Sequence, residues 1–229
     1  SEIISGIQFY KIYNSSKTKT QSSNYLRDST WVDIYNSSFI NSSSNQVYHK
    51  YKLVVGLENL PYKSILEPLL GNLLLDFGGT VMTRATQTNR SVFKTKSNAL
   101  VAPVICYESM YGEFMTDYVR NGAQLIAIIT NDGWWGNSPG HKQLLSYSRL
   151  RSIELRRSIV RSANTGISAV INEKGDIINS IEYEKNGIIN DKISISNKLT
   201  FYAKYGDYIS RISLFFFIII FLFYFAKKK

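Results

Sequence analysis

The sequence has few residues of the types that hold metals: one cysteine and two histidines among 229 residues. A familiar zinc site cannot be built from them, because structural zinc takes four Cys or His ligands. Charged residues are also scarce, at 19% against 44% hydrophobic residues. Disordered chains show the opposite balance, so we expect most of this chain to be globular.

Acidic residues are outnumbered by basic ones, 17 to 27, which gives a formal net charge of +10. A basic balance can attract nucleic acid. The sequence has no zinc-finger spacing and no recognition-helix or RNA-binding signature, so nucleic acid is not an expected partner. The densest basic cluster, RLRSIELRRSIVR from Arg149 to Arg161, favours a solvated face near anionic lipid headgroups, with compositional drift as the alternative.

The C-terminal end contains the longest uncharged run, ISLFFFIIIFLFYFA from Ile212 to Ala226, followed by Lys227 to Lys229. Crossing a bilayer takes roughly 20 apolar residues, so Tyr208 to Arg211 and the lysines must complete the span at the interfaces. A buried C-terminal helix is the alternative, but buried helices are rarely uniformly Phe, Ile and Leu. We predict a membrane-spanning helix over residues 208–229, with its lysine end in the cytoplasm. Ser1 to Tyr10 has no features of a cleavable signal.

Short apolar runs alternate with helix-like segments along the rest of the chain. A leucine- and glycine-rich loop interrupts this pattern after Val55. Strands alternating with helices, together with hairpin-like pairs, predict an α/β sandwich of layers. Strands are predicted at 3–10, 31–40, 46–55, 90–93, 99–108, 125–132, 159–165 and 192–197, and a pair of strands with a Lys174-Gly175 turn between them is predicted over 167–180. Helices are predicted at 112–121 and 142–158.

Cys106 lies at the predicted junction of an apolar strand and a helix, in VAPVICYESMYGEF. The carboxyl ends of strands are where α/β proteins present reactive groups to a crevice. A lone cysteine after an apolar strand is, however, more often a packed hydrophobe than a nucleophile. Position alone leaves both interpretations open.

Five segments of the sequence, in order, carry a resemblance to a known family. They are Tyr48 to Val54 with Glu58 eight residues after Lys50, Ile105 to Glu108, Ile129 to Gly136, Arg161 to Ala169, and Phe201 to Asp207 before the terminal helix. Together they resemble the carbon-nitrogen hydrolase (nitrilase) superfamily and, within it, the bacterial apolipoprotein N-acyltransferases. The resemblance covers nearly the whole chain, but it departs from the family pattern at Val55-Gly56-Leu57, where many members have Pro-Phe-Gly.

The resemblance implies a nitrilase-like layered α-β-β-α sandwich over residues 1–207, followed by one transmembrane helix. It implies that Cys106 takes an acyl chain from a phospholipid as a thioester and passes it to the α-amino group of a diacylglyceryl-cysteine on a lipoprotein. Lys50 would lower the pKa of the thiol and stabilise the oxyanion, although a surface lysine is the default interpretation. No metal or diffusible cofactor is implied. The location would be the bacterial inner membrane, with the domain on the periplasmic side.

Five further residues are expected at or near the pocket on the same basis. Glu58 is eight residues after Lys50, while Tyr107 and Glu108 directly follow the nucleophile. Trp134 and Trp135 are expected either to line a lipid-facing entrance or simply to pack. Each of the two glutamates also has a structural interpretation: a solvated loop carboxylate for Glu58 and a buried pair for Glu108.

The family's general base is a glutamate after a proline at the end of the first strand, and Glu2 is too close to the first predicted strand to be it. We therefore expect the domain to lack its first strand and helix and to be inactive alone. The chain would then be the C-terminal part of an acyltransferase: a truncated chain, the product of a split gene with a separately encoded N-terminal half, or the product of a decayed gene. The alternatives are a membrane-tethered nitrilase-type amidase and a non-catalytic remnant or partner subunit.

Overall fold

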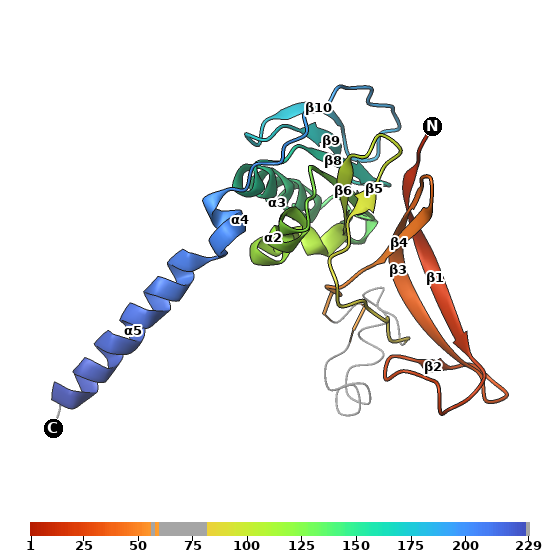
Figure 1. Ribbon diagram of the computed structural model, residues 1–229, viewed down its shortest axis with the longest axis horizontal. Helices are drawn as coiled ribbons and strands as arrows, with labels where there is room; N and C mark the ends of the chain where they lie inside the picture. Colours follow the sequence, from red (N-terminus) through yellow and green to blue (C-terminus); the bar gives the residue numbers. More distant parts are fainter. Residues whose placement is uncertain (56–57, 60–81, 228–229) are drawn as a thin grey trace.

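The computed structural model describes residues 1–55, 58–59 and 82–227. Its N-terminal part forms a four-stranded sheet in which the central strand β3 pairs antiparallel with the three other strands (Figure 1). The predicted strand at 46–55 ends early, at His49, so Lys50 stands in the loop after the strand. The strands are β1 (Ile4–Tyr13), β2 (Asn24–Tyr25), β3 (Trp31–Asn41) and β4 (Asn45–His49).

A second sheet has six strands in the order β10-β9-β8-β7-β6-β5. Its centre is parallel, because β6, β7 and β8 are joined by crossovers through helices α2 (Gly112–Arg120) and α3 (Gly140–Leu155). The remaining pairs are antiparallel. The strands are β5 (Phe93–Lys94), β6 (Leu100–Ile105), β7 (Leu125–Thr130), β8 (Ile159–Ala163), β9 (Ser168–Ile171) and β10 (Ile177–Ile181).

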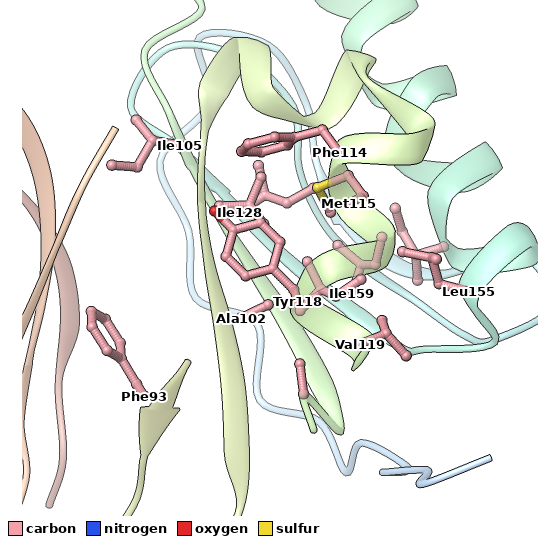
Figure 2. Close-up of a cluster of buried hydrophobic side chains, with 14 of the residues drawn as sticks. Phe93, Ala102, Ile105, Phe114, Met115, Tyr118, Val119, Ile128, Leu155 and Ile159 are labelled. Atoms are coloured by element: carbon pink, nitrogen blue, oxygen red, sulfur yellow. The ribbon is translucent and has the colours of Figure 1, made fainter. Parts of the chain in front are cut away.

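The core lies on both faces of β6. On one face β3 packs against β6 and β1 against β7, so closely that a methyl added at Gly6 would lie 3.1 Å from Ile129 Cγ2. On the other face, Phe114, Met115 and Tyr118 of α2 fill the space over the sheet (Figure 2). The described residues thus form an α-β-β arrangement within the predicted α-β-β-α sandwich.

Further predicted elements differ from the structure. Helix α3 ends at Leu155 and not at Ser158, because Arg156 takes a left-handed conformation with φ 48°. Residues 192–197 do not form the predicted strand. Ser196 N donates to Gln124 O at 3.2 Å, but no ladder of backbone hydrogen bonds develops along the segment. The predicted leucine- and glycine-rich loop includes residues 60–81, which lie outside the described residues.

The prediction that the arginine cluster faces solvent is wrong for Arg151, Arg157 and Arg161, which are buried, whereas Arg149 and Arg156 are exposed. Arg157 shows the reason: its guanidinium donates to the backbone carbonyls of Ala123 at 2.7 Å and Lys198 at 2.8 Å. These carbonyls come from distant segments of the chain. The arginine therefore holds separate segments together, and burial lowers its pKa.

The C-terminal end consists of a short helix, α4 (Phe201–Tyr205), and a long one, α5 (Tyr208–Lys227). Thr200 caps α4, because its Oγ1 accepts from Ala203 N at 2.9 Å. Helix α5 projects away from the domain, and its apolar side chains are exposed (Figure 1). It is long and apolar enough to cross a membrane.

Candidate active site

Cys106 stands at the turn between strand β6 and a 3-10 helix, η1 (Cys106–Met110). Its φ is +51°, a left-handed conformation that is uncommon for a residue with a side chain. The residue is partly exposed, whereas Val101 to Ile105 before it are buried. Cys106 follows the carboxyl end of β6 directly, because the strand stops at Ile105, three residues before its predicted end at Glu108.

Lys50 is almost completely buried, with 1% of its surface exposed, so the default interpretation of a surface lysine does not hold. Its Nζ lies 2.7 Å from Glu58 Oε2. That oxygen also accepts from Val54 N at 2.8 Å, and the side-chain amide of Asn36 donates to Glu58 Oε1. A buried ammonium requires such a partner, and these contacts hold the partner in place.

Glu108 is fully buried and accepts hydrogen bonds from both sides of the site. Its Oε1 accepts from the Tyr48 hydroxyl at 2.6 Å and from Tyr51 N at 2.7 Å. Its Oε2 accepts from Ile105 N at 2.9 Å. Burial raises the pKa of Glu108, while these hydrogen bonds and the charge of Lys50 act in the opposite direction.

These contacts tie the lysine loop to the cysteine turn. Tyr51 directly follows Lys50 and Ile105 directly precedes Cys106, and both donate to one carboxylate. Lys50 and Glu58 thus lie in the loop after β4, and Cys106 and Glu108 lie in the turn after β6. The backbone contacts of Glu108 hold these two segments side by side. Tyr107 extends the cluster, with its ring 5.3 Å from that of Tyr111 in a T-shaped contact.

Trp134 and Trp135 lie on another 3-10 turn, η2 (Gly133–Trp135), and are 59% and 44% exposed. Trp135 packs over Gly140, where an added methyl would lie 2.5 Å from its ring. The base of the turn is fixed by Asp132, whose buried carboxylate pairs with Arg161. Neither tryptophan joins the hydrogen-bond network of Lys50, Glu58 and Glu108 in the part of the chain that the structure describes.

Sequence reasoning assigned no role to Tyr48 or Asn36, the side chains that hold the two carboxylates. For Tyr48 a signal existed: it lies two residues before Lys50, on the same face of an extended segment. Asn36 reaches the site through the pairing of β3 with the following loop, where Lys50 N donates to Asn36 O at 2.8 Å. No short-range pattern encodes that neighbour.

Two further observations concern the residues around the site. Over residues 1–55, 58–59 and 82–227, no group of three or more His, Cys, Asp or Glu is placed to bind a metal ion. Gly56 and Leu57, where the sequence departs from the family pattern, lie outside the described residues. The reactive groups that the described site offers are a thiol, an ammonium and carboxylates.

A layered α/β core that presents a cysteine, a buried lysine and a glutamate defines a class of protein, and comparison with known sequences agrees. The family model for carbon-nitrogen hydrolases matches residues 20–197. The chain belongs to the carbon-nitrogen hydrolase family. Within that family its sequence is similar to proteins named apolipoprotein N-acyltransferase.

One of these, from Shewanella oneidensis, is 32% identical over 172 residues, covering 75% of this chain and 32% of the relative. Another, from Bradyrhizobium diazoefficiens, is 37% identical over 177 residues, covering 76% and 32%. The chain thus spans about a third of the length of these relatives. A carbon-nitrogen hydrolase from Helicobacter pylori G27 shares the fold, with a TM-score of 0.52, 11% identity, and coverage of 67% of this chain and 55% of that one.

Proposed function

We propose that this chain is the C-terminal part of an apolipoprotein N-acyltransferase. The observation that carries the proposal is the buried Lys50–Glu58 pair, tied through Glu108 to the turn of Cys106. The similarity to named apolipoprotein N-acyltransferases supports the same assignment. The acyl donor is a membrane phospholipid, and the acceptor is the α-amino group of a diacylglyceryl-cysteine on a lipoprotein.

In the first half-reaction the Cys106 thiolate attacks the ester carbonyl of the phospholipid. The C–O bond breaks, and the lysophospholipid leaves as an alcohol after it takes a proton. Lys50, held by Glu58, donates to the oxyanion of the tetrahedral intermediate, as electrostatic stabilisation requires. In the second half-reaction the lipoprotein amine attacks the thioester, the C–S bond breaks, and the amine proton returns the thiolate to a thiol.

Both half-reactions need a general base that takes the proton of the attacking group and returns it to the leaving group. We propose that a further segment, in the same polypeptide or encoded separately, supplies a glutamate for this role. β1 offers a place for that segment, because it pairs on one edge only among the described residues and exposes Ile7, Phe9, Tyr10 and Ile12. Hydrogen exchange tests this: the amides of β1 should exchange more slowly once the segment is present.

We also propose that α5 spans the bacterial inner membrane, with the domain on the periplasmic side and the lysine end in the cytoplasm. Its 20 residues are about 30 Å long at 1.5 Å per residue, which matches the hydrocarbon core. Protease added to spheroplasts should then digest the domain and leave a C-terminal tag protected. A digested tag with a protected domain would contradict this orientation.

Thioester formation tests the reaction itself. The chain, alone and with its genomic upstream region, is expressed in bacterial membranes and given phospholipid with a labelled acyl chain. When the upstream region is present, we expect the chain to form a hydroxylamine-sensitive acyl adduct. Cys106→Ala should not form this adduct. No adduct in either form would exclude the acyltransferase, and release of ammonia from amides instead would favour an amidase.

A further inference from the structure

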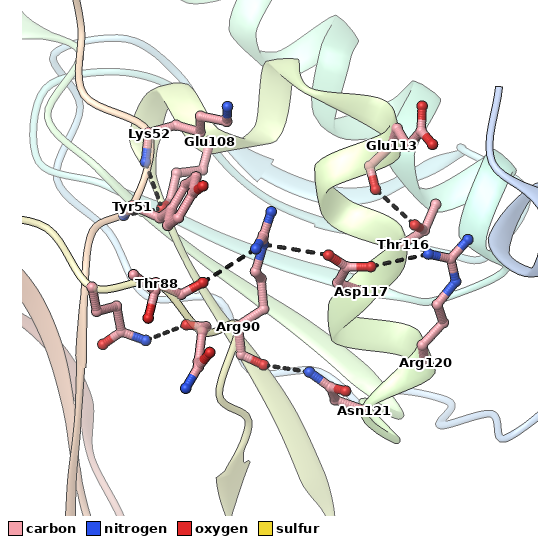
Figure 3. Close-up of polar contacts among 12 residues, drawn as sticks. Tyr51, Lys52, Thr88, Arg90, Glu108, Glu113, Thr116, Asp117, Arg120 and Asn121 are labelled. Carbon is pink, nitrogen blue, oxygen red and sulfur yellow. Dashed lines mark hydrogen bonds and ion pairs between the residues drawn. The ribbon is translucent and has the colours of Figure 1, made fainter. Parts of the chain in front are cut away.

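A pocket of about 500 Å³ lies beside the cysteine turn and has no part in the acyl-transfer steps described above. The loop after Lys50 and the loop before β5 form one wall, and α2 forms the other (Figure 3). Polar side chains dominate its lining. Those that matter here are Lys52, Arg90, Tyr111, Glu113, Asp117 and Arg120.

Among the described residues, the pocket holds one cation, Lys52, that has no carboxylate partner. Asp117 pairs with both Arg90, at 3.5 Å, and Arg120, at 3.0 Å. Lys52 has no carboxylate within 4.0 Å in the described residues. Its Nζ instead lies 5.3 Å from the ring centre of Tyr51 and 5.2 Å from that of Tyr111. The aromatic rings partly desolvate this ammonium, which strengthens its attraction for an anion.

Arg90 is held in a fixed orientation at the centre of the same pocket. Its guanidinium carbon lies 4.4 Å from the ring centre of Tyr51 and 4.6 Å from that of Phe114. Figure 3 shows it reaching from its loop toward Asp117 on α2. A planar guanidinium fixed in this way loses little freedom when it binds an oxyanion, and its donor geometry matches phosphate oxygens.

The pocket lies between the candidate nucleophile and the apolar helix. On one side, Tyr111 contacts Tyr107, which follows Cys106 directly. On the other side, Glu113 pairs with Arg211 in the first turn of α5. If α5 spans the membrane, Arg211 lies at the level of the lipid headgroups and so does this pocket.

We propose that this pocket binds the phosphodiester of a membrane phospholipid headgroup, with Lys52 and Arg90 as the anion-binding groups. The inference rests on the proposed function, in which a phospholipid is the acyl donor, and it locates the headgroup of that donor. The ester carbonyl of the same lipid then extends past Tyr111 toward Cys106. A lipid is favoured over free phosphate because the pocket adjoins the base of the apolar helix.

Binding by the full chain in nonionic detergent micelles tests this without any acyl transfer. The probes are dihexanoyl-phosphatidylglycerol, dihexanoylglycerol as the phosphate-free analogue, and inorganic phosphate, each titrated calorimetrically. We expect Lys52→Gln to weaken binding of the phospholipid about tenfold, because a charge-assisted contact is lost. Lys52→Arg should keep most of the affinity, and the matched control Lys174→Gln, in the exposed β9–β10 turn, should change nothing.

Phospholipid binding that is equal in wild type and Lys52→Gln would overturn the proposal, as would binding of dihexanoylglycerol as tight as that of the phospholipid. Binding of inorganic phosphate without the phospholipid would overturn the lipid assignment. Near-UV circular dichroism checks that Lys52→Gln keeps the fold, since only its backbone N–H reaches Glu108. Cys106→Ala should bind normally, so a failure of acyl transfer and a failure of headgroup binding give different results.

Discussion

Replacing Glu108 with glutamine tests whether one carboxylate joins the two halves of the site. Its two oxygens accept from the Tyr48 hydroxyl, Tyr51 N and Ile105 N, all within 2.9 Å. Glutamine keeps one acceptor oxygen but turns an NH₂ group toward a donor on the other side. A buried donor left without a partner costs about 1–3 kcal/mol. We expect Glu108→Gln to lower the free energy of unfolding by about that amount.

A double-mutant cycle with Tyr48→Phe isolates the strongest of these contacts. The hydroxyl donates to Glu108 Oε1 at 2.6 Å, and both groups are buried. Hydrogen bonds to charged groups contribute about 1.5–3 kcal/mol. We expect a coupling energy in that range between the two substitutions, because each removes the contact that the other depends on.

Thermal unfolding of the full chain in detergent micelles, followed by near-UV circular dichroism, measures both effects. A protein of this size shifts its Tm by about 2–4 °C per kcal/mol, so a drop of roughly 2–12 °C is expected for Glu108→Gln. Glu182→Gln, an exposed glutamate, serves as the matched control. An unchanged Tm for Glu108→Gln, with a coupling energy near zero, would refute the role of Glu108 in joining the lysine loop to the cysteine turn.

Three other predictions use the same unfolding assay or a simple titration. Glu58→Gln leaves the Lys50 ammonium buried without its charged partner, so it should lower the free energy of unfolding by up to about 3–5 kcal/mol. Glu58→Gln combined with Lys50→Gln should lower it by less, and equal losses would contradict this. Gly112→Ala should lower the Tm, because the new methyl would overlap Arg151 Nη1 and lie 2.5 Å from the Tyr202 hydroxyl; an unchanged Tm would contradict it. Burial and a hydrogen bond to Asp33 raise the pKa of Tyr13 to about 12, so its contribution to stability should be complete below pH 10 and lost as the pH rises through 12. Absorbance at 295 nm, compared with Tyr13→Phe, follows this titration, and a midpoint near 10 would refute it.

The parts of the fold that the sequence predicted well are those set by local pattern. β6 ends where its apolar run ends, at Ile105, so Cys106 was correctly placed at a strand end. Helix α2 stops at Arg120, next to the predicted end at Asn121. The apolar run at the C-terminus likewise forms one helix from Tyr208. In each case the pattern of neighbouring residues was enough to predict the element.

The predictions that failed depend on partners far away in the chain. The arginine cluster was expected to face solvent. The charges in the sequence do not show that the Arg157 guanidinium donates hydrogen bonds to the carbonyls of Ala123 and Lys198. The alternating pattern of residues 192–197 is typical of a strand, yet a strand also needs a neighbour in register. Glu108 could be placed near the nucleophile by spacing, but its donors Tyr48 and Tyr51 come from β4 and the loop after it, far away in the chain.

The direction in which α5 leaves the domain should depend on Arg120 more than on the ion pair nearest to the helix. Glu113 and Arg211 are 47% and 62% exposed at the side chain, so their pair contributes little in water. The side chain of Arg120 instead binds the backbone of α4. Its Nε donates to Ala203 O at 2.8 Å, and its Nη2 donates to Lys204 O at 3.3 Å.

Arg120→Gln should therefore change the depth of the domain at a membrane, whereas Glu113→Gln should not. Quenching of tryptophan fluorescence by brominated lipids in vesicles measures this depth, since Trp134 and Trp135 are exposed. Lys204→Gln controls for the loss of a nearby positive charge. A larger change with Glu113→Gln than with Arg120→Gln would mean that the surface ion pair, and not the contact between α2 and α4, sets the height of the cysteine turn above the lipid.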